Sequence, residues 1–211
     1  MISQFNINGK KIILFGGIKG LIRDGDDLRN ALVEYRPDSI YIVLTQEQID
    51  GLKSFIKDPF ELSLSDYEIS YGLHLSVYGE VMTPPPIYIE AVKYSEENDV
   101  KILPLDVPED DYQDHYTRSV RTFDLIHNSL RKRKIIKMEF GDKTPEDFVE
   151  KWNAMMQKVK GLRLVDEYRL RYIKEQIDLV LKKDTKDNII FIVTEYEFYR
   201  DLENQIGKFN S

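Results

Sequence analysis

The stretch Tyr78–Asp106, YGEVMTPPPIYIEAVKYSEENDVKILPLD, predicts a turn, a helix and a strand in direct succession. Three consecutive prolines end any preceding helix, but they suit the first turn of a new one, where a missing N–H has no intrahelical partner. Ile87, Ala91 and Tyr94 then recur at helical spacing. The following KILPL is a short apolar run typical of a strand. We therefore expect Asp106 at the carboxyl end of a strand, where parallel α/β sheets bind ligands.

Three other apolar runs predict further strands, and helical patterns separate them. Strands joined by helices are parallel, with right-handed crossovers. We therefore expect an α/β fold: one domain, 1–211, with a mainly parallel central sheet and helices on both faces. The four predicted strands are Lys11–Phe15, Ile40–Leu44, Lys101–Leu105 and Ile189–Val193.

Residues 107–185 carry helical patterns throughout and predict a helical insertion before the last strand. Within it we expect one long helix from Tyr116 to Lys137, with Phe123, His127 and Leu130 on its inner face. His127 is interpreted as a packed core histidine. Further helices are expected near Pro145 and Leu162.

Composition excludes several classes of site. The 211 residues contain no cysteine, so disulfides, thiolate nucleophiles and cysteine-based metal sites are absent. No apolar run approaches the roughly 20 residues that span a bilayer, and no leader pattern is evident, so we expect a soluble cytoplasmic protein. The net charge of −7 opposes nucleic-acid binding. We interpret the basic run Arg131–Lys137 as a solvated helix end.

Two glycine turns flank candidate binding positions. The run KIILFGGIKG breaks at Gly16-Gly17, but it matches neither dinucleotide-binding nor phosphate-loop patterns, so we interpret the glycines as a tight turn before Lys19. Gly79 ends a helix and places Glu80 on a turn.

One arginine interrupts an apolar helical stripe. Arg169 lies among Leu162, Val165, Ile173 and Ile177 at helical spacing, so its side chain faces inward. Removing the partner of a buried guanidinium costs about 3–5 kcal/mol, so a carboxylate should lie against it. The candidates are Glu80, Asp106 and Asp166. A structural salt bridge and a residue presented to a ligand remain equal alternatives.

These landmarks, in this order, resemble the TraB/PrgY family, which includes the Tiki-type metalloproteases and is related in fold to EreA/ChaN-like proteins. The resemblance covers nearly the whole chain and implies a divalent metal site. It is carried by Pro37-Asp38, Gly79-Glu80, Leu105-Asp106 and RLRYI at Arg169–Ile173.

The chain departs from the family pattern at the residues that carry its chemistry. Lys19 and Glu197 stand where the resemblance puts two metal-binding histidines, Val43 replaces a carboxylate, and Val107 replaces an arginine. A lysine ammonium has no lone pair to offer a metal. We therefore expect no metal centre, and an ion pair between Lys19 and Glu197 in its place. In the alternative, Lys19 extends into solvent and Glu197 only favours the helix N-terminus.

The resulting functional prediction is a divergent TraB-like binding or regulatory protein. A small molecule or peptide would occupy a pocket at the carboxyl ends of the strands, and a homo-oligomer is compatible with the sequence. The candidate binding residues are Lys19, Glu197, Gly16, Gly17 and Gly79.

Two alternatives stay open. The first is a peptidase-like or small-ester hydrolase that uses Glu80 and Asp106 for acid–base chemistry and Arg169 or Lys19 as electrophile. Such an enzyme would bind Mg²⁺ through an acidic run, whose members are Asp106, Glu109, Asp110, Asp111 and Asp114. The second is an interaction module that uses the helical insertion, which an exposed apolar patch there would favour.

Overall fold

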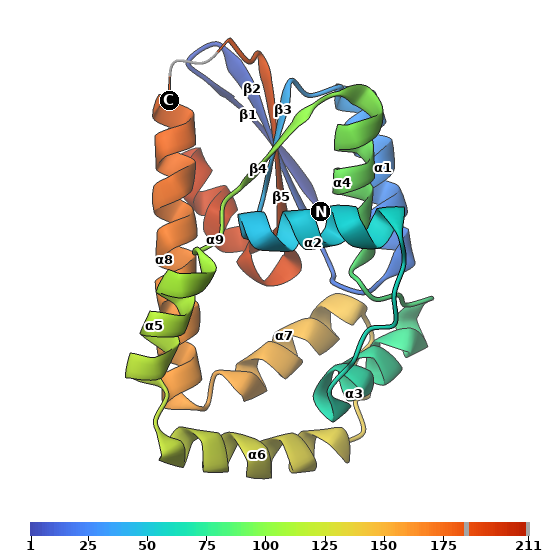
Figure 1. Cartoon of the computed structure of the whole chain (residues 1–211), viewed down its shortest axis with the longest axis vertical. Coiled ribbons are helices and arrows are strands. Elements are labelled where there is room, and N and C mark those ends of the chain that lie inside the picture. Colours follow the sequence, from blue (N-terminus) through green and yellow to red (C-terminus); the bar gives the residue numbers. More distant parts are fainter. Residues whose placement is uncertain (184–185, 210–211) are drawn as a thin grey trace.

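The computed structural model describes residues 1–183 and 186–209, and its centre is a five-stranded sheet flanked by helices (Figure 1). The strand order is β1-β2-β5-β3-β4. The β2–β5, β5–β3 and β3–β4 pairs are parallel, which confirms the predicted mainly parallel α/β fold. The strands are β1 (Ile2–Ile7), β2 (Lys10–Gly17), β3 (Ser39–Ile42), β4 (Lys101–Pro104) and β5 (Ile189–Glu195).

The edge strand β1 was not predicted, and it pairs antiparallel with β2. Its residues alternate between exposed and half-buried, so no continuous apolar run marks it. The signal lies in the turn: Asn8 and Gly9 both have positive φ, as a two-residue hairpin between antiparallel strands requires.

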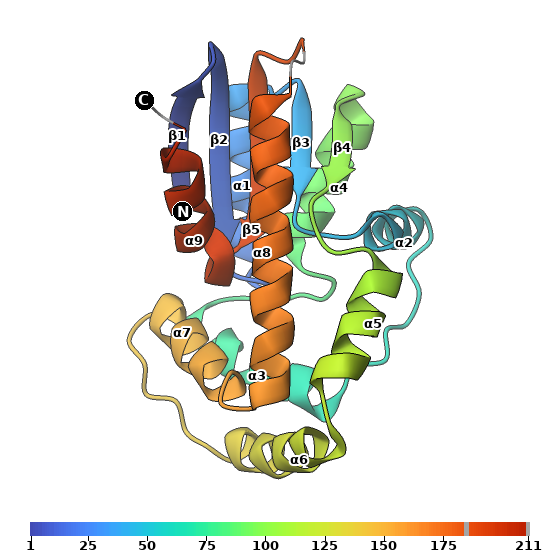
Figure 2. The ribbon, with the colours of Figure 1, turned by 90° about the vertical axis from the view of Figure 1, so that its left-hand side faces the viewer.

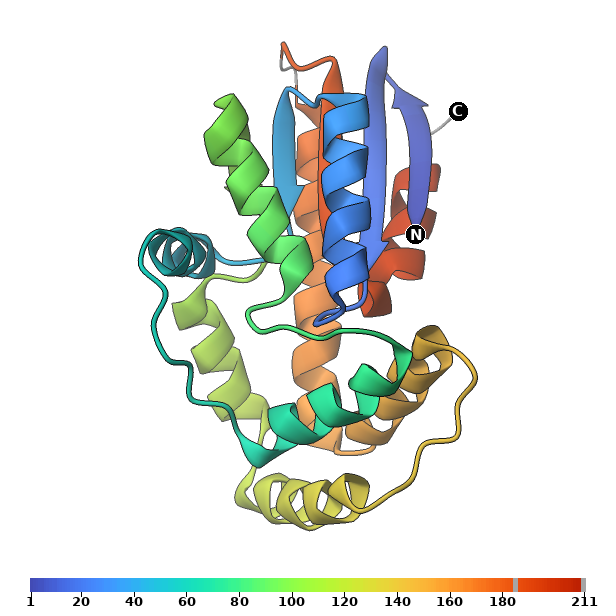
Figure 3. The ribbon, with the colours of Figure 1, turned by 90° about the vertical axis from the view of Figure 1, so that its right-hand side faces the viewer.

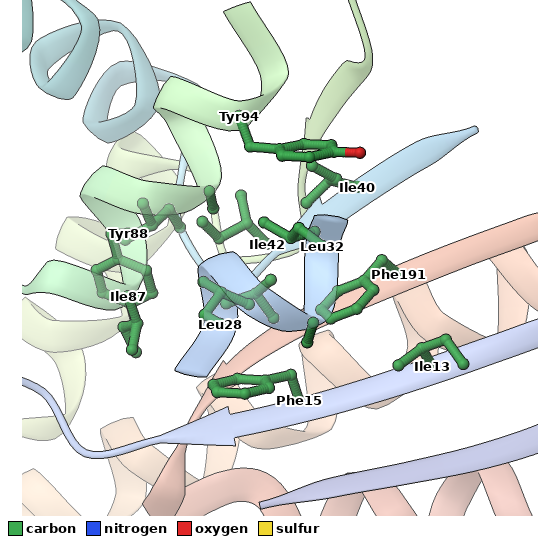
Figure 4. Packing of buried hydrophobic residues seen from close by; sticks show 14 of the residues in the cluster. Ile13, Phe15, Leu28, Leu32, Ile40, Ile42, Ile87, Tyr88, Tyr94 and Phe191 are labelled. Carbon is green, nitrogen blue, oxygen red and sulfur yellow. The ribbon is translucent and has the colours of Figure 1, made fainter. Parts of the chain in front are cut away.

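Helices cover both faces of the sheet. Figure 3 shows α1 (Ile22–Tyr35) and α4 (Pro86–Asn98) on one face, and Figure 2 shows α8 (Lys160–Lys182) and α9 (Tyr196–Gly207) on the other. The first face buries a cluster that includes Phe15, Leu28, Ile87 and Phe191 (Figure 4). The strands β2, β3 and β5 are therefore largely buried on both sides, which agrees with their continuous apolar sequences.

Between β4 and β5 the chain forms the predicted helical insertion. It comprises α5 (Glu109–Ser119), α6 (Thr122–Ile136), α7 (Pro145–Met156) and α8. The prediction of one long helix from Tyr116 to Lys137 was wrong, because Val120 is extended and the chain restarts a helix after Arg121. Asp124 stabilises that restart by accepting a hydrogen bond from the Arg121 backbone N–H at 3.0 Å.

The helices α5, α6 and α7 and the first part of α8 lie below the carboxyl ends of the strands together with α3 (Asp66–Leu75) and the short η1 (Ser76–Tyr78) (Figure 1). An aromatic cluster joins α3 to α7, with the Trp152 ring centroid 4.9 Å from that of Tyr67 and 5.3 Å from that of Tyr71. The basic run takes part in this packing. Arg131 donates to the Met155 carbonyl at 2.8 Å, and the Lys132 ammonium lies 4.9 Å from the Tyr67 ring centroid.

The remaining helix, α2 (Gln46–Lys57), follows β3 and begins with a capping box at Thr45 and Gln48. None of the helices in the described part of the chain combines the length and apolar character that crossing a bilayer requires.

Gly16 and Gly17 belong to the end of β2, so the prediction that they form a tight turn was wrong. They permit close helix packing on the two faces of the sheet. A Cβ at Gly16 would lie 2.8 Å from the Cβ of Tyr199 on α9, and a Cβ at Gly17 would lie 2.7 Å from a methyl group of Ile87 on α4. Both distances are shorter than van der Waals contact, so these positions admit only glycine without a shift of a helix.

We predict that Gly16→Ala lowers the free energy of unfolding by about 1–3 kcal/mol, because overpacking displaces α9 from the sheet. Gly51→Ala in α2 is the matched control, since its added Cβ meets no atom within 4 Å. That control should gain roughly 0.5–1 kcal/mol from helix propensity. Urea unfolding measures both changes, and equal stability of the Gly16 variant and the parent protein would contradict the packing argument.

Candidate functional site

Five charged side chains meet at the carboxyl ends of β2, β5 and β4. Lys19 follows β2, Glu195 ends β5, Asp106 follows β4, Glu197 opens α9 and Arg169 reaches in from α8. The parallel pairing of β2 with β5 brings Lys19 and the two glutamates to the same edge. Asp106 and Glu195 are buried. We call these five residues the charged cluster.

Arg169 binds Asp106, as predicted. Its Nε donates to Asp106 Oδ1 at 2.9 Å and to Oδ2 at 2.7 Å, and its Nη2 also donates to Oδ2. The backbone N–H of Val107 donates to Asp106 Oδ1 at 2.8 Å. Both oxygens of Asp106 are therefore engaged.

Glu195 connects the two cations of the cluster. Lys19 Nζ lies 3.0 Å from Oε2, Arg169 Nη2 donates to Oε1 at 3.2 Å, and the Tyr88 hydroxyl donates to Oε1 at 3.0 Å. Burial opposes the negative charge of Glu195, but the charges of Lys19 and Arg169 outweigh it and lower the pKa to about 2. Glu195 is thus an ionised carboxylate at the end of β5, and both of its oxygens have partners.

The two cations are held in their charged forms by the same carboxylates. Burial acts to lower the pKa of Lys19, but the charges of Glu195 and Glu197 outweigh it and raise that pKa. In the same way, burial is outweighed for Arg169 by Glu195 and Asp106, which raise its pKa well above the usual value.

The predicted Lys19–Glu197 ion pair is present only at its outer limit. The Lys19 Nζ to Glu197 Oε1 distance is 4.0 Å, whereas the unpredicted partner Glu195 is nearer. Glu197 also lies in the first turn of α9, as the alternative required. Burial raises the pKa of Glu197; Lys19 opposes this rise, and Glu195 adds to it. Glu197 Oε2 is buried and has no hydrogen-bond partner among residues 1–183 and 186–209.

A cavity of about 740 Å³ opens beside Lys19 and Glu197. It lies between the sheet edge, α3, α7 and the 81–85 loop, and we call it the aromatic cavity. Its walls include Tyr67, Tyr71, Gly72, Leu75, Val81, Trp152 and Met156. Burial, followed by the negative charge of Glu197, raises the pKa of Tyr71. Like Glu197 Oε2, the Tyr71 hydroxyl has no hydrogen-bond partner in the described part of the chain.

A second cavity of about 390 Å³ lies on the other side of the cluster, against α2. Arg169, Glu195 and Tyr88 line it together with Phe55 and Phe60. Arg169 and Tyr88 both donate to Glu195 there, so this cavity borders carboxylate and donor groups that are already paired.

The predicted site residue Glu80 lies outside the cluster. Its side chain is exposed, and its backbone carbonyl accepts a hydrogen bond from the Ile22 N–H at 3.0 Å. Gly79 ends η1 just before it. The turn therefore lies beside the loop after β2, and Glu80 is not the partner of Arg169. The acid pair of the hydrolase alternative, Glu80 with Asp106, is not brought together.

The residues of the cluster do not fit the divalent metal that the family resemblance implies. Two cationic side chains occupy it, and they already bond to Asp106 and Glu195. Within residues 1–183 and 186–209, no group of three or more His, Asp or Glu side chains is placed to hold a metal ion. Outside Asp106, the acidic run proposed for Mg²⁺ is exposed on α5.

Sequence reasoning missed Glu195 and Tyr88. The signal for Glu195 was the one used for Asp106, a carboxylate where a buried strand ends; here the run NIIFIVTE simply continues two residues further than the predicted strand. Tyr88 is buried in the first turn of α4, where its hydroxyl needs a partner.

Comparison of the sequence with family models and with curated proteins finds no match.

We predict that Glu195→Gln lowers the free energy of unfolding by about 2–4 kcal/mol at pH 7, because it removes the buried carboxylate shared by two half-buried cations. The folded-state pKa lies below the ordinary value of 4.5, so this stabilisation is present above pH 4.5 and is lost as the pH falls toward 2. Urea unfolding at a series of pH values should show the gap between parent and variant closing on acidification. A gap independent of pH would contradict the assignment.

Glu197→Gln should act with the opposite sign. Because the folded-state pKa of Glu197 is raised, its ionised form destabilises the protein at neutral pH, and that cost disappears below its ordinary value of 4.5. The variant should therefore be at least as stable as the parent at pH 7 and no more stable in acid. The same urea series measures it, and a loss at pH 7 comparable with that of the Glu195 variant would refute the distinction.

Proposed function

We propose that this protein binds a small molecule or short peptide in the aromatic cavity, without a metal centre, and has a binding or regulatory role. The observation that carries the proposal is a cavity with apolar walls beside two buried polar atoms, Glu197 Oε2 and the Tyr71 hydroxyl, that lack hydrogen-bond partners among the residues that the structure describes. Small-molecule sites are concave, mostly apolar and about 300–1,000 Å³ in volume, with a few polar groups that orient the ligand. The cavity meets each of these criteria.

The state of Asp106 and Glu195 argues against the hydrolase alternative, which relies on Asp106 for acid–base chemistry. General acid–base catalysis needs a carboxyl group free to exchange a proton with the substrate. Both oxygens of Asp106 are occupied by Arg169 and the Val107 N–H, and Glu195 is held ionised by two cations. The ordered landmarks in the sequence support a divergent TraB-like ancestry, and we propose that the site keeps the position of the family's centre with a different use.

The proposal predicts that filling the aromatic cavity abolishes ligand binding. Gly72 lines the cavity on α3, and a Cβ added there meets no atom within 4 Å, so Gly72→Phe should fold normally and occupy the space. Gly51→Phe is the matched control, because Gly51 is also an uncrowded helical glycine but lines the second cavity. Compounds that raise the melting temperature of the parent in a library screen should act on the Gly51 variant and not on the Gly72 variant.

The reverse pattern, with binding lost only in the Gly51 variant, would move the site to the second cavity. Hits that act equally on both variants would remove either cavity as the site and with it the proposal. Circular dichroism of the unliganded variants checks that both are folded.

A second candidate function rests on α6. Phe123, Ile126 and Leu130 recur at helical spacing along one side of this helix and are 77%, 56% and 61% exposed. An apolar stripe of this kind on a surface helix marks an interaction site. We propose that two copies of the chain associate through this stripe.

Light scattering tests the association. The parent protein should have the mass of a dimer at micromolar concentration, and Leu130→Lys should shift it toward the monomer because it places a charge in the apolar contact. Val33→Lys is the control, since Val33 is an exposed apolar residue on α1, at the far face of the sheet. A monomeric parent, or equal masses for all three proteins, would exclude this use of α6.

A further inference from the structure

The charged cluster contains one more carboxylate than cation, and the carboxylate without a close cation lies beside the aromatic cavity. Three carboxylates, Asp106, Glu195 and Glu197, face two cations, Lys19 and Arg169. Arg169 bonds Asp106 on two oxygens, and Lys19 lies nearest to Glu195. Glu197 is the carboxylate left over, because its contact with Lys19 is 4.0 Å and therefore too long for a hydrogen bond.

The leftover carboxylate borders the cavity and is largely withdrawn from bulk water, with 15% of its side-chain surface exposed. An ionised carboxylate only accepts hydrogen bonds, so a partner for its free Oε2 must bring an N–H or O–H donor. A buried charge without a partner is costly, and a donor that is also positive removes that cost.

The walls of the cavity favour a cation as well. The faces of tryptophan and tyrosine attract ammonium groups within about 6 Å of the ring centroid. Trp152, Tyr67 and Tyr71 lie together on the cavity wall. The negative charge of Glu197 contributes to the raised pKa of Tyr71. An anion is disfavoured: Lys19 is already paired with Glu195 at 3.0 Å, and a further negative charge would enlarge the imbalance of the cluster.

We propose that the aromatic cavity binds a small organic ammonium compound with its charged nitrogen on Glu197 and the Tyr71 hydroxyl and its apolar body against Trp152 and Met156. This inference rests on the proposed binding function and names the chemical class of its ligand. The inner part of the cluster, Arg169 with Asp106 and Glu195, holds the site in place without touching the ligand. The cavity volume of about 740 Å³ admits a molecule with an aromatic ring and a short chain.

Three matched probes separate charge from shape: phenylbutylamine, phenylbutanol and phenylbutanoate. Trp152 is the only tryptophan of the chain and lines the cavity, so its fluorescence reports binding directly. At pH 7 the amine should bind at least about tenfold more tightly than the alcohol, as expected for a charge-assisted hydrogen bond, and the anion should bind most weakly.

Glu197→Gln keeps the shape of the side chain and removes its charge, so it should weaken amine binding more than alcohol binding, and the advantage of the amine over the alcohol should vanish. Glu34→Gln is the control, an exposed glutamate on α1 away from the cavity, and should preserve the full advantage. Tyr71→Phe should weaken amine binding by a smaller factor, because it removes a neutral hydrogen-bonding group.

The outcomes distinguish this inference from the function on which it rests. Equal affinity for amine and alcohol, tighter binding of the anion, or an amine preference that survives Glu197→Gln overturns the ligand class. If Gly72→Phe still blocks the probes in those cases, the cavity remains a binding site for another chemistry. If no probe perturbs Trp152 and no library compound depends on the cavity, both proposals fall.

Discussion

The buried carboxylate of Glu195 is the interaction on which the site depends. It ends the central strand β5, which has a parallel neighbour on each side, and so lies at the middle of the carboxyl edge of the sheet. A lone carboxylate there would be costly to desolvate, and Lys19, Arg169 and Tyr88 together satisfy it. These three partners come from the loop after β2, from α8 and from α4, so one carboxylate ties both helical layers to the sheet edge.

This arrangement requires the helices to approach the sheet closely. Gly16 and Gly17, on adjacent positions of β2, face opposite sides and admit Tyr199 of α9 and Ile87 of α4. A larger residue at either position would move a helix outward. Such a shift would also change where Tyr88, one residue after Ile87, reaches Glu195. The absence of a side chain at Gly17 and the hydrogen bond from Tyr88 to Glu195 are therefore coupled through α4.

The sequence predicted most of the fold and only part of the site, for physical reasons. The parallel strands β2, β3 and β5 are largely buried on both faces and their sequences are continuous apolar runs, whereas β1 alternates and is marked only by its Asn8-Gly9 turn. The exposed Phe123 and Leu130 of α6 were expected to be buried, because helical spacing of apolar residues does not reveal whether a partner covers them.

For the site, the position of Arg169 in an apolar stripe predicted a carboxylate partner, and Asp106 is that partner. Which acids join the cluster depends on strand order. Glu195 enters because β5 lies between β2 and β3, and no local pattern encodes that placement. The prediction that Glu80 could pair with Arg169 was wrong for a related reason. The Glu80 carbonyl bonds to Ile22 beside the loop after β2, but tertiary packing sets the direction of a side chain on a loop, and this one is exposed.

Some residues of the charged cluster are paired with one another, whereas Glu197 lacks a close partner. This difference explains how one site can combine rigidity with binding. Asp106, Arg169 and Glu195 bond to one another and to neighbouring protein groups, which fixes their geometry. Glu197 lines the aromatic cavity, and its buried Oε2 has no hydrogen-bond partner within the described part of the chain. A ligand that supplies the missing partner gains a charge-assisted bond without breaking one, because the neighbouring ion pairs stay intact. A ligand is then recognised by the Glu197 carboxylate, which is the member of the charged cluster without a close cationic partner. The ion pairs among the other members hold this carboxylate in a fixed position, and this preorganisation makes binding selective.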